Sequence, residues 1–247
     1  MQHELVSIIT PMYNSSKYIL ETLNSVFNQT HQHFEIILID DASTDNTLQC
    51  LPKDNRIKII RLNKNSGSAV ARNEGIKLAK GKYLTFLDAD DLWFPNFIEK
   101  SIQTIKTSKI NFVFASYKRL DENLNPLLKD FIVPLKVTYS DILKTNSISC
   151  LTAFINIEVL GKKYMPLVRK RQDMGLWLQY LKEIKFAYGI KEPLAIYRIR
   201  KNSLSRNKWK LIKSQWDFYR KVENLNIIQS IYYFIAWVFY GILKYKN

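Results

Sequence analysis

Cysteine is scarce in this sequence, and the short motifs of several large protein classes are missing. Cys50 and Cys150 are the only two cysteines and lie far apart without a CxxC spacing, so neither a zinc site nor a disulfide framework is indicated. Neither GxGxxG nor GxxxxGK followed by Ser or Thr occurs, which argues against a dinucleotide oxidoreductase and a P-loop NTPase. With 247 residues, 47% of them apolar, and no repeat or Gly/Ser-rich linker, the chain fits one α/β domain with a full core.

Acidic residues are also in deficit. The chain carries 22 Asp and Glu against 37 Lys and Arg, a net charge of +15, and therefore needs an anionic partner or surface. Residues 208–216 interleave basic and aromatic side chains, as a nucleic-acid-binding segment would, but no helix-turn-helix, zinc knuckle or RNA-binding aromatic pair accompanies them. We therefore expect no nucleic acid and favour an anionic membrane surface. The first residues show no basic stretch followed by a long apolar core, so no signal peptide is evident and the cytoplasmic side is expected.

The C-terminal segment, residues 206–247, combines basic and aromatic residues at helical spacing. Residues 227–243 are almost wholly apolar, but the run is short and contains Gln229 and Ser230, whereas a membrane span needs about 20 apolar residues. We expect an interfacial helix on the inner face of the cell membrane, with basic side chains drawn to anionic lipids. The alternative is an aromatic helix packed against the rest of the chain or against a partner subunit in a homo-oligomer. Four side chains carry the helical spacing that leads into this run: Trp209, Ile212, Trp216 and Tyr219.

Apolar runs typical of strands alternate with helical patterns over the first ninety residues. Strand-like runs occupy residues 5–10, 34–41, 57–62 and 82–91, and helical patterns lie at residues 17–28 and 68–79. This order predicts an α/β fold with a largely parallel sheet and helices on its faces.

Carboxylates end two of these runs without any spacer. One run ends in Asp41, and another ends in Asp88, Asp90 and Asp91. If the backbone stays extended, Asp88 and Asp90 point the same way, into the crevice outside the carboxyl ends of the strands. Convergent carboxylates suit a hard cation, Mg²⁺ or Mn²⁺, which takes its other oxygens from water and substrate phosphates. The alternative is an acidic surface turn that closes a strand.

Five segments in order resemble the family 2 glycosyltransferases, which are inverting enzymes of the GT-A fold. They are VSIITPMYN at 6–14, SVFNQT at 25–30, IDDASTDNT at 39–47, NSGSAVARNEG at 65–75 and GKYLTFLDADD at 81–91. Two later blocks, at residues 171–178 and 197–205, resemble the subset that builds bacterial surface polysaccharides, including teichuronic acid, capsule and O-antigen. The resemblance implies a Rossmann-like, mostly parallel sheet flanked by helices over residues 1–205, followed by the helical, aromatic-rich tail. Within it, residues 1–107 would bind the nucleotide and residues 108–205 the acceptor.

The resemblance also implies roles for individual residues in binding a nucleotide-sugar donor. Pro11, Tyr13 and Asp41 would hold the base and ribose, with Asp41 accepting from a uracil N–H. Arg72 would border the base or diphosphate. Asp88 would lie on the ribose and metal side. Asp90 would be the first choice as metal ligand, and Asp91 the second.

Asp173 matches the position of the family's catalytic base. The preceding residue is Gln172, where the family usually has Glu, which leaves the hydrogen bonding on the acceptor side open. Spacing alone would favour another role for Asp173, the N-cap of a helix over residues 174–182.

Arg200 stands where many relatives carry His near the metal. A charged Arg does not ligate a cation, but its planar fork can pair with phosphate oxygens. We therefore expect Arg200, together with Arg198, to contact the diphosphate when a loop through Ser203 and Ser205 closes and excludes water. The alternative is that both arginines alternate as exposed residues on an edge strand.

Together these features predict an inverting glycosyltransferase. It would move a hexosyl or N-acetylhexosaminyl group from a UDP-sugar to a hydroxyl of a polyprenyl-diphosphate-linked bacterial surface polysaccharide. Two rivals remain, a nucleotidyltransferase that makes an NDP-sugar and a non-catalytic membrane-bound scaffold with a dead nucleotide site. A nucleotidyltransferase usually has a glycine-rich basic loop after its first strand, which residues 13–17 lack.

Overall fold

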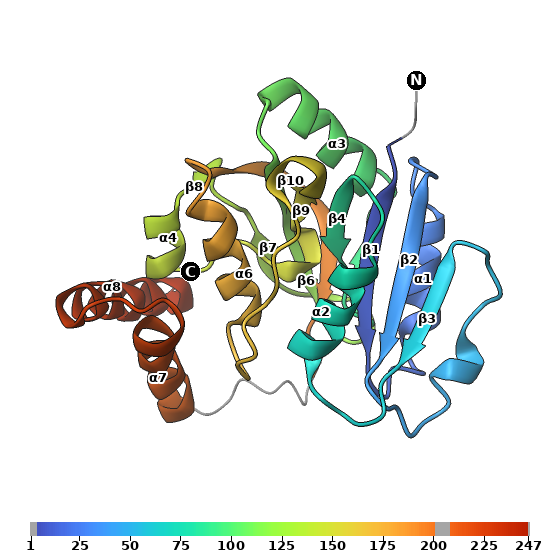
Figure 1. Ribbon diagram of the computed structural model, residues 1–247, viewed down its shortest axis with the longest axis horizontal. Helices are drawn as coiled ribbons and strands as arrows, with labels where there is room; N and C mark the ends of the chain where they lie inside the picture. The colour runs from blue at the N-terminus through green and yellow to red at the C-terminus, as the bar shows by residue number, and fades with distance from the viewer. Residues whose placement is uncertain (1–3, 201–207, 247) are drawn as a thin grey trace.

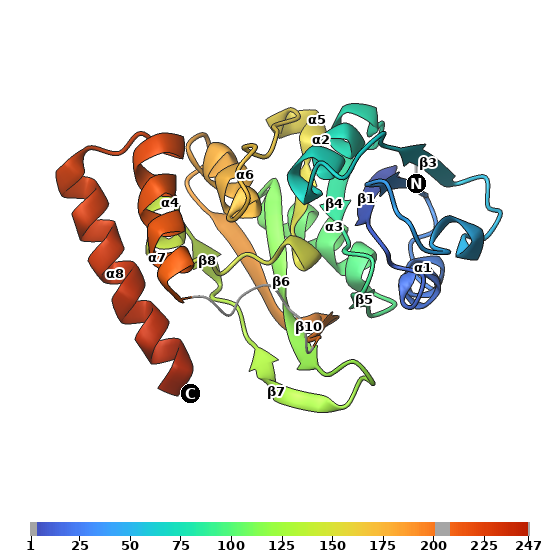
Figure 2. The same cartoon turned by 90° about the horizontal axis from the view of Figure 1, so that it is seen from below.

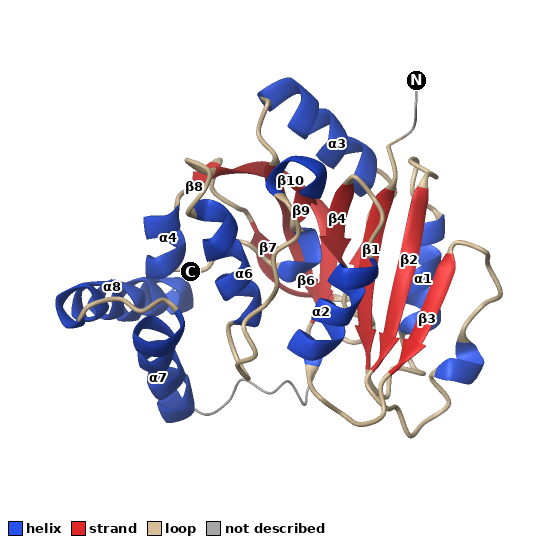
Figure 3. Ribbon diagram, viewed as in Figure 1, coloured by secondary structure: helices blue, strands red, loops and turns tan. Residues whose placement is uncertain are grey.

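The computed structural model describes residues 4–200 and 208–246 of the chain, which build a single mixed sheet with helices on both faces (Figures 1 and 3). The sheet has ten strands, and its main path runs β3-β2-β1-β4-β9-β6-β10-β5, with β7 on β6 and β8 on β10. This is the α/β architecture that the alternating pattern predicts.

The first half of the sheet is parallel. Strands β1 (Val6–Met12), β2 (Phe34–Asp40), β3 (Ile57–Arg61) and β4 (Tyr83–Phe86) all run the same way. Alternate residues of β1 enter opposite cores, because side chains alternate across a strand: Ile9 packs with helix α2 (Ser68–Leu78), and Ile8 packs with α1 (Ile19–Phe27) and α3 (Phe97–Ser108). The carboxyl ends of these strands therefore meet at one edge of a doubly covered sheet.

The second half continues the same sheet with mixed directions. Strand β9 (Phe154–Asn156) lies antiparallel between β4 and β6 (Phe112–Leu120), so residues on both sides of position 107 share one hydrogen-bonded sheet. Strand β10 (Ala187–Arg198) is parallel to β6 and antiparallel to β5 (Leu92–Trp93). The remaining elements are β7 (Pro126–Phe131), β8 (Lys136–Val137), α4 (Tyr139–Lys144), α5 (Ile157–Leu160), α6 (Gln172–Leu181) and the 3₁₀ turns η1 (Leu48–Cys50) and η2 (Cys150–Thr152).

The C-terminal helices pack against α4 and the core around α6 rather than standing apart from the sheet. Helix α7 (Lys208–Asp217) runs into a π-helical turn, η3 (Phe218–Val222), and α8 (Ile227–Lys246) folds back beside α4 at one end of the molecule (Figures 1 and 2). Phe218 and Tyr219 are buried in the same core as Trp177 of α6. In the described ranges, 4–200 and 208–246, no helix has the length and apolarity to span a bilayer.

Helix α8 has two unlike faces. Its inner face packs Tyr233 and Phe234 against the core, which agrees with the packing alternative. Its outer face leaves large apolar side chains in solvent, and the interfacial role of this face stays a prediction. The outer-face residues are Ile227, Ile228, Ile231, Tyr232, Ile235, Val238, Phe239, Tyr240 and Ile242.

Candidate functional site

Three carboxylates meet in a tight turn just beyond β4. The strand ends at Phe86, and the amide of Asp91 donates to the carbonyl of Asp88 at 3.1 Å. The expectation that an extended backbone aligns Asp88 with Asp90 is therefore wrong, and the acidic turn is the observed geometry. The turn spreads the three side chains over different partners, because each peptide unit changes direction within it.

Each of these carboxylates lies against an arginine. Asp88 Oδ1 lies 2.5 Å from Arg72 Nη2, and Asp90 Oδ2 lies 2.8 Å from Arg200 Nε. Asp91 is buried and accepts from the backbone amide of Arg198 at 2.8 Å. Arginines from α2 and from the end of β10 thus converge on one acidic turn.

The acidic turn carries a surplus of negative charge despite these partners. Burial, followed by the charge of Asp88, raises the pKa of Asp90, and burial with the charges of Asp90 and Asp88 raises the pKa of Asp91 well above its usual range. Like charges in a partly dry site disfavour ionisation, so a bound cation would be stabilised there.

These residues fit a divalent cation that shares its coordination with a ligand. Across the described residues, no three His, Cys, Asp or Glu side chains are grouped as a complete metal site. Mg²⁺ and similar hard cations commonly use only one or two protein carboxylates together with substrate phosphates and water. Asp90 and Asp91 are the candidates, with Asp88 held by Arg72.

Arg198 is part of the framework of the site rather than an exposed residue. Its side chain is 5% exposed, donates to the carbonyls of Asp90 and Glu122, and pairs with Glu21 at 2.6 Å. The edge-strand alternative is wrong for Arg198, because β10 has neighbours on both sides and buried polar groups must be paired. Arg200 differs, since half of its side chain is exposed. Ser203 and Ser205 lie outside the described residues.

The residues expected to hold the nucleoside lie at the carboxyl ends of β1 and β2. Pro11 is half-buried within β1, and Tyr13 is exposed just beyond it. Asp41 is buried, and its two oxygens accept from the backbone amides of Ser66 and Gly67 at 2.7 and 2.8 Å. Asp41 therefore fixes the turn that starts α2, and each oxygen retains a second lone pair for a ligand donor.

Asp173 lies in the first turn of α6. Arg171, in a left-handed conformation with φ 65°, is the N-cap residue of this helix, so the expectation that Asp173 is the cap is wrong. The Asp173 carboxylate instead accepts from Asn146 Nδ2 at 3.3 Å. Burial raises its pKa, although the amide of Met174 and the charge of Arg72 oppose that rise. A carboxylate with a raised pKa is a stronger base than an exposed one.

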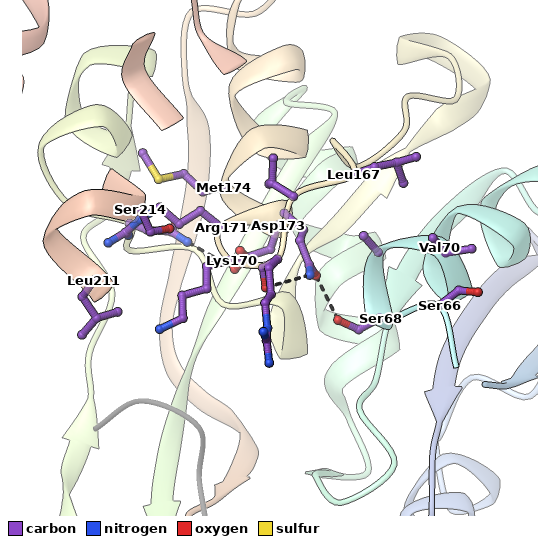
Figure 4. Close-up of a pocket in the computed structure, with 16 residues that line it drawn as sticks. Ser66, Ser68, Val70, Leu167, Lys170, Arg171, Asp173, Met174, Leu211 and Ser214 are labelled. Atoms are coloured by element: carbon purple, nitrogen blue, oxygen red, sulfur yellow. Dashed lines mark hydrogen bonds between the residues drawn. The ribbon is translucent and has the colours of Figure 1, made fainter. Parts of the chain in front are cut away.

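Asp173 and Asn146 are shared by two cavities. The smaller cavity, about 390 Å³, is lined by Arg72, Asp88 and Asp91 together with Tyr117 and Tyr197. The larger, about 1130 Å³, lies between the start of α2, residues 167–174 and helix α7. Figure 4 shows its two walls, with Ser68 and Val70 on one side, Leu211 and Ser214 on the other, and Lys170, Arg171 and Asp173 between them.

Gln172 joins the two sides of the larger cavity. It accepts from Ser68 of α2 at 2.9 Å and donates to the carbonyl of Arg169 at 3.2 Å. Glutamine supplies both a donor and an acceptor here, which glutamate would not. These contacts give Gln172 partners within the protein, and its part in binding the acceptor stays a prediction.

Several residues of the site carried no signal that pointed to them in the sequence. Asn146 sits in a loop of the variable half, and Tyr117 lines the smaller cavity from the middle of a strand. Cys150 lies in the same cavity, but burial raises the pKa of its thiol, which keeps it protonated and unreactive. Only the fold brings these residues to Asp173.

The comparisons with known proteins agree with this architecture. Residues 7–155, more than half of the chain, match the model of glycosyl transferase family 2. The chain belongs to that family and is a glycosyltransferase of the GT-A fold.

Relatives and solved structures extend the match to nearly the whole chain. The glycosyltransferase TuaG of Bacillus subtilis, assigned to teichuronic acid biosynthesis, is 42% identical, with 94% of each chain covered. WfgD of Escherichia coli, a UDP-Glc:alpha-D-GlcNAc-diphosphoundecaprenol beta-1,3-glucosyltransferase, is 36% identical over 100% of this chain and 99% of its own. TarS 1–349 of S. aureus with UDP-GlcNAc superposes with a TM-score of 0.71 (21% identity), and the mannosyltransferase PcManGT of Pyrobaculum calidifontis with GDP-Man and Mn²⁺ with 0.65 (17% identity). Both structures cover 94% of this chain, which covers 71% of each.

Proposed function

We propose that this glycosyltransferase moves a sugar, with inversion, from a UDP-sugar to a hydroxyl of a lipid-diphosphate-linked saccharide in the synthesis of a bacterial surface polysaccharide. The observation that carries the proposal is the position of Asp173 between two cavities, one acidic with an arginine at its wall and one basic. A base must lie between the two substrates, because inversion requires in-line attack from the face opposite the leaving group.

The smaller cavity takes the donor. Its acidic turn and Arg72 face the diphosphate, while Pro11, Tyr13 and Asp41 lie at the nucleoside end of the same sheet edge. A divalent cation, Mn²⁺ or Mg²⁺, supplies charge neutralisation of the leaving diphosphate when bound. The Mn²⁺ in the PcManGT structure and the UDP-sugar in the TarS structure support this choice of ligands.

Asp173 is the general base in this mechanism. Its carboxylate takes the proton of the acceptor hydroxyl, whose oxygen forms a bond to the anomeric carbon as the bond to the diphosphate oxygen breaks. The hydrogen bond from Asn146 orients the carboxylate and stabilises its ionised form. Arg200 can leave Asp90 for the diphosphate in this mechanism, because its side chain is half exposed.

The acceptor class follows from the relatives. WfgD, and WfaP of Escherichia coli at 32% identity, are both named for transfer to alpha-D-GlcNAc-diphosphoundecaprenol, and TuaG is assigned to teichuronic acid. Similarity over almost the full length of each protein includes the half that binds the acceptor. A lipid-linked saccharide on the cytoplasmic face of the membrane is therefore the best-supported acceptor.

A panel of nucleotide sugars tests the donor assignment. In the presence of Mn²⁺, UDP-sugars are expected to raise the melting temperature of the protein, because a ligand that binds only the folded state stabilises it by RT ln(1 + [L]/Kd). GDP- and TDP-sugars at equal concentration serve as controls. Stabilisation by a GDP- or TDP-sugar alone would overturn the choice of UDP. If nucleotide sugars bind to the protein but none is transferred or hydrolysed, the result would favour the non-catalytic scaffold.

Membrane attachment through the outer face of α8 is the second part of the proposal. Ile228 and Ile235 are 76% and 63% exposed, and changing both to Ser is expected to lower binding to anionic phosphatidylglycerol vesicles at least about 10-fold. Vesicle flotation measures the binding. The difference between anionic vesicles and neutral phosphatidylcholine vesicles gives the electrostatic contribution to the binding. This pair leaves the inner face of α8 intact, whereas a truncation before α8 would uncover the core.

A matched control variant removes exposed apolar surface from elements other than α8. Val159 and Leu128 are 60% and 51% exposed on α5 and β7, and changing both to Ser is expected to leave vesicle binding unchanged. If the α8 variant floats as well as the unmodified protein, the outer face does not bind lipid. A shift from dimer to monomer in that variant would instead make the face a homo-oligomer contact.

A further inference from the structure

The larger cavity beside Asp173 has an unusual charge pattern. Three consecutive basic residues, Arg169, Lys170 and Arg171, line it on the Asp173 side. In the part of the chain that the structure describes, none of the three forms an ion pair with a carboxylate. Asp173 is the one carboxylate among the described residues that line the cavity, so the three basic side chains leave an excess of positive charge, which attracts an anion.

Arg171 packs against helix α8 and has one unpaired donor. Its guanidinium lies over the ring of Trp237 of α8, 5.1 Å from the ring centroid, and its Nε is buried without a hydrogen-bond partner. Burial lowers its pKa. Its backbone is in the left-handed region, which a non-glycine residue adopts only when its surroundings enforce it. Arg171 also lines the cavity, and a buried donor without a protein partner can be satisfied by a ligand.

The two cavities differ in what an anion would need in order to bind. The donor cavity contains Asp88 and Asp91, so a diphosphate there meets negative charge unless a cation is present. The larger cavity sets three basic side chains against the single carboxylate of Asp173. An anion there would need no divalent metal.

We propose that Arg169, Lys170 and Arg171 form the binding site for the diphosphate of the acceptor, a proposal that rests on the function proposed above. In a lipid-diphosphate-linked saccharide the first sugar is joined directly to the diphosphate. When that sugar is the acceptor, its reactive hydroxyl and the diphosphate are separated by a single ring. Asp173 lies two residues after Arg171 and lines the same cavity, which puts the base and the proposed anion site within one cavity. Arginine and lysine together provide bidentate and point-charge contacts to phosphate oxygens.

Steady-state kinetics with two acceptors test this site. The first is N-acetylglucosamine linked through a diphosphate to a short prenyl chain, and the second is the same sugar on an uncharged alkyl chain. The unmodified protein is expected to prefer the diphosphate acceptor in kcat/KM. The double variant Arg169→Gln, Lys170→Gln is expected to reduce that preference at least about 10-fold, since each charged hydrogen bond lost is worth roughly a factor of ten. Lys58→Gln removes an exposed charge on β3, at the far end of the sheet, and is the matched control.

Calorimetry with inorganic diphosphate in EDTA gives an independent measurement. Binding by the unmodified protein and its loss in the double variant are expected. An unchanged acceptor preference, or a rise in the KM of the donor alone, would overturn the site, and so would diphosphate binding that requires Mn²⁺. Absence of sugar transfer to either acceptor, with metal-free diphosphate binding intact, would instead count against the proposed function. Melting curves confirm folding, and Lys170→Gln alone is the second variant should the double variant unfold.

Discussion

Replacing Asp173 by Asn is expected to lower kcat by at least about 10²-fold while the affinity for the donor stays nearly the same. A positioned general base typically contributes about 10²- to 10⁴-fold in rate, and the amide keeps the shape of the carboxylate without its basicity. Asp173 is not the N-cap of α6, so the melting temperature should change little. Initial rates with saturating donor and calorimetry of donor binding measure the two effects.

The rate of the same reaction should depend on pH through the protonation of Asp173. Because burial raises the pKa of Asp173, the active, deprotonated form is lost as pH falls through that raised pKa, and kcat should fall with it. The acid limb should disappear in the Asn variant.

Asp141 provides a matched control for the loss of a carboxylate near a helix start. It belongs to a true capping box with Thr138 at the start of α4, so Asp141→Asn should lower the melting temperature and leave kcat unchanged. Near-normal kcat in the Asp173 variant would mean that another group takes the proton.

Removing the divalent metal, or changing Asp90 to Ala, is expected to reduce UDP-sugar turnover by at least roughly 10²-fold without unfolding the protein. The acidic turn beyond β4 would then repel the diphosphate, and the charge that develops on it would lose its counterion. Asp90 is the cleaner target because, among the described residues, its carboxylate forms its ion pair with the half-exposed Arg200, whereas Asp91 is buried and holds the backbone of Arg198.

Thermal stabilisation by UDP provides a readout separate from activity. UDP should stabilise the unmodified protein more with Mn²⁺ than with EDTA, and this difference should vanish in the Asp90 variant. Full turnover in chelator would remove the metal from the mechanism.

The order of elements and the meeting of the carboxylates could be predicted because they depend on local patterns. Apolar runs such as those of β1 and β2 form strands that are buried on both faces, and parallel strands bring their carboxyl ends to one edge. The acids that follow β2 and β4 therefore lie at the same edge of the sheet, on either side of β1. Their roles in binding stay predictions.

Contacts between distant segments could not be predicted in the same way. Arg198 is buried because Glu21, 177 residues earlier, and two carbonyls surround it, and nothing near Arg198 in the sequence indicates those partners. The turn at residues 88–91 likewise contacts Arg198 at the end of β10 and Arg200 just beyond it, more than 100 residues later in the chain. The same holds for Asn146, whose contact with Asp173 joins a loop to a helix.

The two-faced helix α8 has a consequence for orientation. Its inner face is fixed through Tyr219, whose hydroxyl donates to the carbonyls of Leu143 and Tyr233, and through the packing of Phe234 on Trp216. The outer face therefore cannot turn independently of the sheet. When the outer face of α8 lies on a surface, the enzyme therefore always has the same orientation relative to that surface. The cavity beside Asp173 then opens at a constant height and tilt above the surface. A substrate confined to that surface would reach the enzyme by diffusion in two dimensions, and the enzyme would not need to reorient between turnovers.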